Sequence, residues 1–338
     1  MTYTTGMYSK ERKEMSHLLE VDGLTTAFDS DFGRTVSVDH VNFTVDKGEV
    51  VCIVGESGCG KSVTSLSIMG LLKKGGTVID GSVLFDNRDL LSMEEKELDE
   101  VRGNSISMIF QDPLTSLNPV FTIGNQITES IRRHLRLSKE DAKKRAEEIL
   151  KRVGMPDPAG VMKKYPHTLS GGMRQRVMIA MALSCEPALL IADEPTTALD
   201  VTIQAQIMEL LKSLQKETGM SLILITHDIG LVASMADRVI VMYAGQVIEE
   251  APVKELFASP VHPYTKALLA TVPGIYDEDD RELESIPGMV PESYDGMKGC
   301  RFADRCAFRT AECEKAQEER FFGNGRRARC VLAEKEGV

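Results

Sequence analysis

Residues 55–62 read Gly55-Glu56-Ser57-Gly58-Cys59-Gly60-Lys61-Ser62, which matches the pattern G-x-x-x-x-G-K-[ST]. An unbroken apolar run, Val50–Val54, precedes this segment, and an apolar pattern with helical spacing follows it. A strand before the glycines and a helix after them are the context in which this pattern forms a phosphate-binding loop. The segment therefore predicts an α/β domain with a phosphate site at the amino end of a helix.

The residues of this loop have separate expected roles, and all eight are assigned to a nucleotide site. The glycines allow the backbone to wrap closely around a phosphate, so that successive N–H groups point inward. We expect Lys61 to reach the β- and γ-phosphates and the Ser62 hydroxyl to bind Mg²⁺. Cys59 occupies a freely variable position of the pattern, and we assign no chemistry to its side chain.

A second apolar run, Leu189–Ala192, ends in two acidic residues. Asp193 suits the Mg²⁺-binding aspartate that accompanies a phosphate-binding loop. Glu194, one residue further on, would project in a different direction and is placed to polarise an attacking water. Alone, this pattern would suit an ordinary strand end with solvated acids. Beside the phosphate-binding loop it predicts a site of nucleotide hydrolysis.

Four further segments complete an ordered set of motifs. They are Phe110-Gln111-Asp112-Pro113, Thr168-Leu169-Ser170-Gly171-Gly172-Met173-Arg174-Gln175-Arg176, Ala198-Leu199-Asp200 and Thr226-His227-Asp228. In this order they resemble the Q-loop, the signature motif, the D-loop and the switch-histidine segment of the ABC-type ATPases. The resemblance implies an α/β P-loop ABC ATPase domain with an inserted helical subdomain, and ATP and Mg²⁺ as its ligands.

The resemblance also implies that two ATPase domains pair head to tail and bury ATP between them. Ser170, Gly171 and Gly172 would then contact the γ-phosphate of the ATP held by the partner's phosphate-binding loop. Small residues suit this place because the backbone must come close to the phosphate. Asp200 would bridge across the dimer.

Three residues form the catalytic set that the resemblance implies. Gln111 would contact Mg²⁺ and the attacking water and couple the site to membrane subunits. Glu194 would be the key carboxylate, and His227 would hold the γ-phosphate and its developing charge. Without the other motifs, His227 would suit an ordinary hydrogen-bonded histidine at a strand end.

Members of this family stack the adenine ring on an aromatic residue upstream of the phosphate-binding loop. Phe28 fits this position best, with Phe32 as its rival. A place in the hydrophobic core suits either ring nearly as well.

A narrower resemblance covers almost the whole chain. The segments 111–119, 174–182 and His262-Pro263-Tyr264 are similar to those of the ATPase subunits of oligopeptide and dipeptide importers, above all the D-type subunit. Met173 stands where most ABC proteins have glutamine, and methionine is common there in this subgroup. The related importers of nickel, glutathione and sugar oligomers are not distinguished from peptide importers by these segments.

This narrower resemblance implies the setting in which the chain works. It would be the motor subunit that hydrolyses ATP at the cytoplasmic face of the cell membrane and drives peptide uptake. Its partners would be two membrane permease subunits, a second ATPase subunit and an extracytoplasmic peptide-binding protein that acts through the permeases. The second ATPase subunit is either another copy of this chain or a paralogue, and the resemblance favours the paralogue.

The chain divides into three regions by composition. Residues 1–16 are polar and without periodic pattern, so we expect a flexible tail. Residues 17–258 alternate apolar runs and helical patterns and form the predicted ATPase domain, with residues 88–185 as its helical insertion. Residues 259–338 contain prolines and glycines that interrupt long elements, and predict a loop-rich extension.

Composition excludes several other classes of protein. The 338 residues carry 40 Lys and Arg against 51 Asp and Glu, a net charge of −11, which disfavours binding to nucleic acid. The longest apolar run, Val177–Leu183, is far shorter than the roughly 18–20 residues that span a membrane. The residues 1–17 contain no apolar segment typical of a secretory signal.

Four of the seven cysteines lie in the extension, at Cys300, Cys306, Cys313 and Cys330. Their spacing contains no C-x-x-C pair, so it differs from the common zinc patterns and from the bacterial ferredoxin run. Four thiolates suit either tetrahedral zinc or an iron–sulfur cluster. Several peptide-importer ATPases carry a [4Fe–4S] cluster in this region, so the resemblance favours the cluster over Zn²⁺. Free or partly buried thiols remain the alternative.

Two rival functions belong to other classes. A soluble ABC ATPase acting on ribosomes or DNA usually has two tandem cassettes, a coiled coil or a basic surface, and this chain has one cassette and a negative charge. A non-catalytic nucleotide switch would only bind and dimerise. The acid at position 194 and the intact histidine at position 227 argue against the switch.

Overall fold

The computed structural model describes residues 17–31, 33–112, 116–197, 199–271, 286–291, 294 and 296–334. The sequence predictions that concern residues 1–16, Phe32, Pro113 and Ala198 fall outside this part of the chain.

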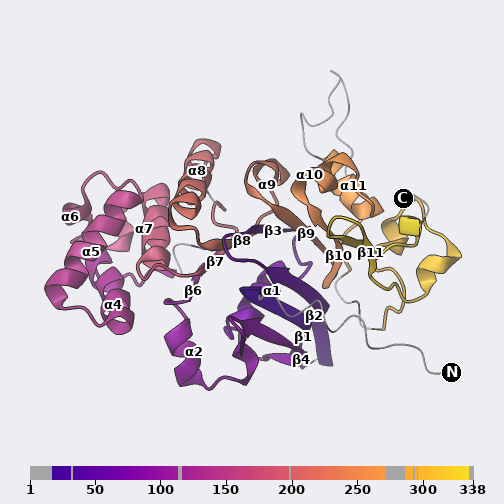
Figure 1. The fold of residues 1–338 in the computed structure, drawn as a ribbon, viewed down its shortest axis with the longest axis horizontal. Helices are drawn as coiled ribbons and strands as arrows, with labels where there is room; N and C mark the ends of the chain where they lie inside the picture. The colour runs from indigo at the N-terminus through magenta and orange to yellow at the C-terminus, as the bar shows by residue number, and fades with distance from the viewer. Residues whose placement is uncertain are drawn as a thin grey trace.

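An eight-stranded sheet forms the centre of the described structure (Figure 1). Its strands, in spatial order, are β11 (Arg320–Phe322), β12 (Arg326–Ala328), β10 (Gln246–Pro252), β9 (Arg238–Tyr243), β3 (Val50–Val54), β8 (Ser221–Ile225), β7 (Leu189–Asp193) and β6 (Ile106–Ile109). The five strands from β9 to β6 are parallel, and β10 returns antiparallel to β9. The carboxyl ends of the parallel strands therefore lie along one edge of the sheet.

A second, antiparallel sheet lies beside the first. Its strands, in spatial order, are β2 (Gly33–Val45), β1 (Leu19–Ser30), β4 (Gly76–Phe85) and β5 (Arg88–Asp89). Helix α1 (Lys61–Ile68) contacts both sheets, because it touches β1, β2 and β4 on one side and β7 on the other. Figure 1 shows this helix close to the antiparallel sheet, where β3 leads into it.

The unbroken apolar strands have two buried faces, as the sequence predicts for a parallel sheet. In β3, Cys52 and Val54 pack into the core on the helix-covered side, whereas Val51 and Ile53 pack into the core shared with the antiparallel sheet. Strands β7 and β8 divide their side chains between the same two cores. Both faces therefore require apolar residues, which explains why no polar residue alternates with them.

Most helices lie beside the central sheet or form a lobe at one end of it (Figure 1). They are α2 (Glu95–Val101), α4 (Ile123–Leu135), α5 (Lys139–Arg152), α6 (Pro158–Val161), α7 (Gly171–Leu183), α8 (Val201–Thr218), α9 (Ile229–Met235), α10 (Val253–Ala258) and α11 (Pro263–Ala270). The lobe contains α4 to α7. The range 88–185, expected to be mostly helical, also includes strands β5 and β6, so the consecutive helices begin at Ile123.

The C-terminal region joins the central sheet directly. Strand β12 pairs antiparallel with β10, and short 3₁₀ turns surround this hairpin. Arg327 of β12 donates hydrogen bonds to the buried carboxylate of Glu250 and to Glu319, with Nη1 2.8 Å from Glu319 Oε2. Glu250 also pairs with Arg238 of β9. A network of charges around the buried Glu250 carboxylate therefore ties the C-terminal region to the central sheet.

We predict that Arg327→Met lowers the free energy of unfolding by about 3 kcal/mol, because it leaves buried carboxylates with one partner fewer. Urea denaturation followed by circular dichroism measures this change. Arg309→Met is the matched control, since Arg309 pairs at the surface with Asp304 and should change stability by less than about 1 kcal/mol. Equal stability of both variants would contradict the role of the network.

Candidate nucleotide-binding site

The candidate site lies at the carboxyl ends of four neighbouring parallel strands. The phosphate-binding loop starts after β3, and Glu194 follows β7. Gln111 comes shortly after β6, and His227 shortly after β8. These strands are adjacent in the order β3, β8, β7, β6, so their polar ends meet although they are far apart in sequence. Ligands of open α/β sheets bind at this edge.

The phosphate-binding loop is held by close backbone packing. Gly55 has a φ of +150°, and a Cβ there would lie 2.2 Å from the carbonyl oxygen of Met242. Only glycine fits at this position. The buried Lys61 donates hydrogen bonds from Nζ to the carbonyl oxygens of Gly55 at 2.8 Å and Glu56 at 2.9 Å. Its ammonium group is therefore held inside the loop, where a phosphate would be bound.

Ser62 and Asp193 are joined across the site. The Ser62 hydroxyl donates to Asp193 Oδ1 at 3.0 Å. Burial raises the pKa of Asp193, and the hydrogen bond from Ser62 opposes this effect. A hydroxyl and a carboxylate in contact are oxygen donors of the kind that Mg²⁺ prefers. Two of the three residues assigned to Mg²⁺ from the sequence are therefore brought together.

Glu194 is at the centre of a second group of contacts. Its Oε2 accepts hydrogen bonds from Gln111 Nε2 at 2.8 Å and from the Thr197 hydroxyl at 2.9 Å. His227 Nδ1 lies 3.6 Å from Glu194 Oε1. Glu194 also has a φ of +44°, a strained conformation for a residue with a side chain. Strain of this kind is characteristic of functional sites, and here it accompanies the convergence of three polar partners on one carboxylate.

One cavity brings the loop and the carboxylate together. Its lining residues are Ser37, Ser57, Gly58, Gly60, Lys61, Ser62, Val63, Gln111 and Glu194. An ammonium group, backbone N–H groups and a carboxylate that faces the same space suit binding of a polyphosphate and attack of water on it. Ser37 of β2 and Thr197 were not found from the sequence, because no motif surrounds the serine and the threonine lies between two recognised motifs.

The signature residues lie elsewhere in the chain. Ser170 is the N-cap of α7, and its hydroxyl accepts a hydrogen bond from Met173 N–H. A Cβ on Gly172 would lie 2.9 Å from the side chain of Ile203 in α8. Asp200 is the N-cap of α8 and accepts from Ile203 N–H at 2.9 Å. The signature and D-loop segments are thus packed together, and none of their described residues lines the cavity that contains Lys61.

Phe28 does not line this cavity either. It lies in β1, and a Cβ on Gly76 of the neighbouring strand would be 2.7 Å from its ring. The adenine-stacking role of Phe28 therefore stays a prediction.

The four C-terminal cysteines line a single small cavity together with the buried His262. Burial raises the pKa of Cys300 to about 11 and also raises the pKa of Cys306 and Cys330. Within the part of the chain that the structure describes, no three His, Cys, Asp or Glu side chains are positioned as ligands of one metal ion. The thiols converge, but their placement is not that of a completed metal site.

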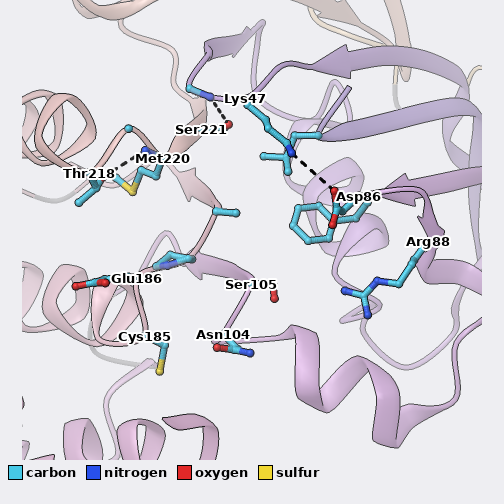
Figure 2. A pocket seen from close by; sticks show the side chains of 16 residues that line it. Lys47, Asp86, Arg88, Asn104, Ser105, Cys185, Glu186, Thr218, Met220 and Ser221 are labelled. Carbon is cyan, nitrogen blue, oxygen red and sulfur yellow. Dashed lines mark hydrogen bonds and ion pairs between the residues drawn. The ribbon is translucent and has the colours of Figure 1, made fainter. Parts of the chain in front are cut away.

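Another cavity lies at the opposite edge of the sheet, where the parallel strands begin (Figure 2). Figure 2 shows Ser105, Cys185, Glu186 and Ser221 around it, with Lys47 pointing toward Asp86 at 4.0 Å. The residues of the phosphate-binding loop do not line it. This cavity is therefore separate from the candidate nucleotide site.

Known proteins resemble this chain over almost its whole length. The family model for ABC transporters matches residues 38–197, and the model for the C-terminal region of oligopeptide/dipeptide transporters matches residues 248–313. The chain is 54% identical to the oligopeptide transport ATP-binding protein AppD of Bacillus subtilis, over 96% of this chain and 99% of the relative. It is 51% identical to the dipeptide transport ATP-binding protein DppD of Haemophilus influenzae, over 93% of this chain and 94% of the relative.

Solved structures lead to the same family. The ATP-binding cassette MJ0796, in a dimeric post-hydrolysis state bound to ADP and Pi, is 32% identical with a TM-score of 0.63, covering 70% of this chain and 98% of that one. The protein cbiO1 of Clostridium perfringens, part of the ABC transporter complex cbiONQ, is 34% identical with a TM-score of 0.60, covering 72% of this chain and 91% of that one. The chain therefore belongs to the ATP-binding subunits of ABC transporters, a family of ATPases, and its C-terminal region is of the oligopeptide and dipeptide transporter type.

Proposed function

We propose that this chain is the ATP-hydrolysing motor subunit of an importer of dipeptides and oligopeptides. The observation that carries the hydrolytic role is the convergence of Lys61, Ser62, Gln111 and Glu194 on one cavity. The peptide cargo is supported by the match of residues 248–313 to the C-terminal region of peptide transporters and by the AppD and DppD relatives.

In the proposed reaction, the backbone N–H groups of residues 55–62 and the Lys61 ammonium bind the phosphates of ATP. Ser62, Asp193 and Gln111 would hold Mg²⁺, which supplies charge neutralisation to the phosphates. Glu194 accepts a proton from the attacking water, and its contact with Gln111 orients the carboxylate. His227, beside Glu194, stabilises the charge that develops on the γ-phosphate.

The position of the signature residues supports a site shared between two ATPase subunits. Ser170, Gly171 and Gly172 do not line their own chain's nucleotide cavity, so a second subunit would have to supply them. Asp200, next to them, would contact the same partner. The relative MJ0796 forms a dimer with bound ADP and Pi. The resemblance to peptide importers favours a paralogue of this chain as the second subunit, with another copy as the alternative.

Exposed apolar side chains in the segment that contains Gln111, residues 110–121, support docking to permease subunits. Phe110, Val120 and Phe121 are 38%, 71% and 50% exposed. Among the described helices, none is long and apolar enough to span a membrane. We therefore propose that two permeases bind this chain at the cytoplasmic face of the membrane, and that a peptide-binding protein acts from the other side.

The regional organisation follows from the same assignments. Residues 17–258 form the ATPase domain, with a helical subdomain inside the range 88–185, and residues 259–338 form a peptide-importer-type extension. This division is supported by the change at α11, after which the described residues form only 3₁₀ turns and two short strands.

We propose that the cysteine cavity holds a [4Fe–4S] cluster, with Zn²⁺ as the alternative. Its support is a set of four thiols around one space, together with His262 Nε2, which is buried and has no hydrogen-bond partner among the described residues. The His262 Nδ1 accepts from Tyr264 N–H at 3.0 Å, so Nε2 carries the proton in the neutral ring. A buried N–H without a partner beside four thiols fits an additional acceptor in that cavity.

We expect Lys61→Ala to weaken ATP binding about 10- to 100-fold, because a charge-assisted contact to phosphate is lost. Titration with a fluorescent ATP analogue measures the dissociation constant. Lys143→Ala, at an exposed position on α5, is the control and should bind like the wild type. Unchanged affinity in Lys61→Ala would show that the assignment of residues 55–62 to the nucleotide site is wrong.

Glu194→Gln should retain ATP binding and lower peptide-stimulated ATP hydrolysis by the assembled importer about 10²- to 10⁴-fold, because the amide cannot accept the proton of water. Phosphate release in proteoliposomes measures the rate. Glu209→Gln, at an exposed position on α8, should hydrolyse ATP at the wild-type rate. Normal turnover of Glu194→Gln would exclude Glu194 as the catalytic carboxylate.

The chain purified without oxygen should contain about four irons and a broad absorption band near ~400 nm. Cys306→Ser and Cys313→Ser should lose the band, whereas Cys185→Ser, a buried thiol outside the cavity, should retain it. One zinc per chain, without iron, would show that the site holds Zn²⁺ and not a cluster. A chain that contains neither iron nor zinc would contradict a metal role for the four cysteines.

A further inference from the structure

The C-terminal region holds one residue of the phosphate-binding loop by both its backbone and its side chain. The Glu56 carboxylate accepts two hydrogen bonds from Arg305, with Oε2 2.8 Å from Nη1 and Oε1 2.9 Å from Nη2. The Glu56 N–H donates to the Tyr264 hydroxyl at 2.8 Å. Two parallel bonds between a guanidinium and a carboxylate fix direction as well as distance.

Glu56 in turn helps to hold Lys61, the lysine expected to bind phosphate. Its carbonyl oxygen accepts a hydrogen bond from Lys61 Nζ at 2.9 Å. The side chain of Glu56 is thus held by Arg305, while its backbone holds both Tyr264 and Lys61. A shift of this one residue would move the lysine and the N–H groups that are expected to bind phosphate.

Arg305 is fixed firmly enough to act as an anchor. Its side chain is only 7% exposed, and Nε donates to the carbonyl oxygen of Pro287 at 2.7 Å. The guanidinium carbon lies 5.7 Å from the ring centre of Tyr243 and 5.8 Å from that of Phe302. These two rings and Tyr264 form one aromatic cluster, with centroid distances between 4.8 and 5.3 Å.

Arg309, four residues later, has a different environment. It is 46% exposed and pairs with Asp304 and Glu314 of its own region. The contact with the phosphate-binding loop is therefore particular to Arg305 and is not a general property of basic residues in the extension.

We propose that Arg305 is a positioning residue for ATP binding: through Glu56 it sets the conformation of the phosphate-binding loop, so the extension forms part of the nucleotide site. This inference rests on the ATP-binding role of residues 55–62, which Lys61→Ala tests separately. Arg305 directly precedes Cys306, so the segment that lines the cysteine cavity also holds the loop.

A double-mutant cycle on the full chain tests the proposal with a fluorescent ATP analogue and Mg²⁺. Glu56→Gln and Arg305→Met should each raise the dissociation constant about tenfold, and the double variant should raise it no further, because each change removes the same contact. In the assembled importer, KM for ATP should rise in parallel, with kcat changed less than about threefold. Arg305→Lys should fall between the wild type and Arg305→Met.

Arg309→Met is the matched control and should bind the analogue like the wild type. If Arg305→Met does not fold, Glu56→Gln carries the test, since it leaves the contacts of Arg305 with Pro287 and Tyr243 in place. Wild-type affinity in Glu56→Gln, or effects of the two single variants that multiply in the double variant, would overturn the proposal. If Lys61→Ala weakens binding and the Glu56 and Arg305 variants do not, the assignment of the nucleotide site stands and only the role of Arg305 is rejected.

Discussion

The parallel pairing of β3, β8, β7 and β6 is the constraint on which the site depends. Because these neighbours run in one direction, the residues that follow them meet at a single edge. This brings together Lys61, Gln111, Glu194 and His227, which are far apart in the sequence. The pairing requires two buried faces on each strand, and the cores on both sides satisfy this requirement. The packing that forms the sheet therefore also fixes the positions of these groups.

Local patterns in the sequence were sufficient for much of this fold. Ser138 and the apolar residues that follow it at helical spacing, Ala142, Ala146, Ile149 and Leu150, predict a helix that stops before Gly154. Helix α5 has Ser138 as its N-cap and buries these four residues. Gly219 predicts the end of a second helix, which is α8, and Gly219 has a φ of +68° directly after it. Contacts between Ser62 and Asp193 and between Gln111 and Glu194 follow from motifs whose spacing and strand context are specific.

Other parts could not be predicted because they depend on contacts between distant segments. Strand β6 is only four residues long within a largely helical range, so its pairing with β7, not its own pattern, reveals it. No motif marks Arg305 or Ser37. Their importance comes from their positions in the structure, because Arg305 binds Glu56 of the phosphate-binding loop and Ser37 lines the nucleotide cavity. The cysteines illustrate a further limit. Spacing identifies four candidate ligands, but the described structure does not arrange three of them around one ion.

ATP hydrolysis at this edge of the sheet is proposed to drive peptide uptake. The most direct measurement is accumulation of a radiolabelled oligopeptide by proteoliposomes that contain this chain, its partner ATPase and the permeases, with the peptide-binding protein outside. Uptake should require ATP on the side where this chain is bound and should stop with Glu194→Gln. ATP hydrolysis at a rate unaffected by peptide-loaded binding protein, without accumulation of peptide, would contradict this proposal.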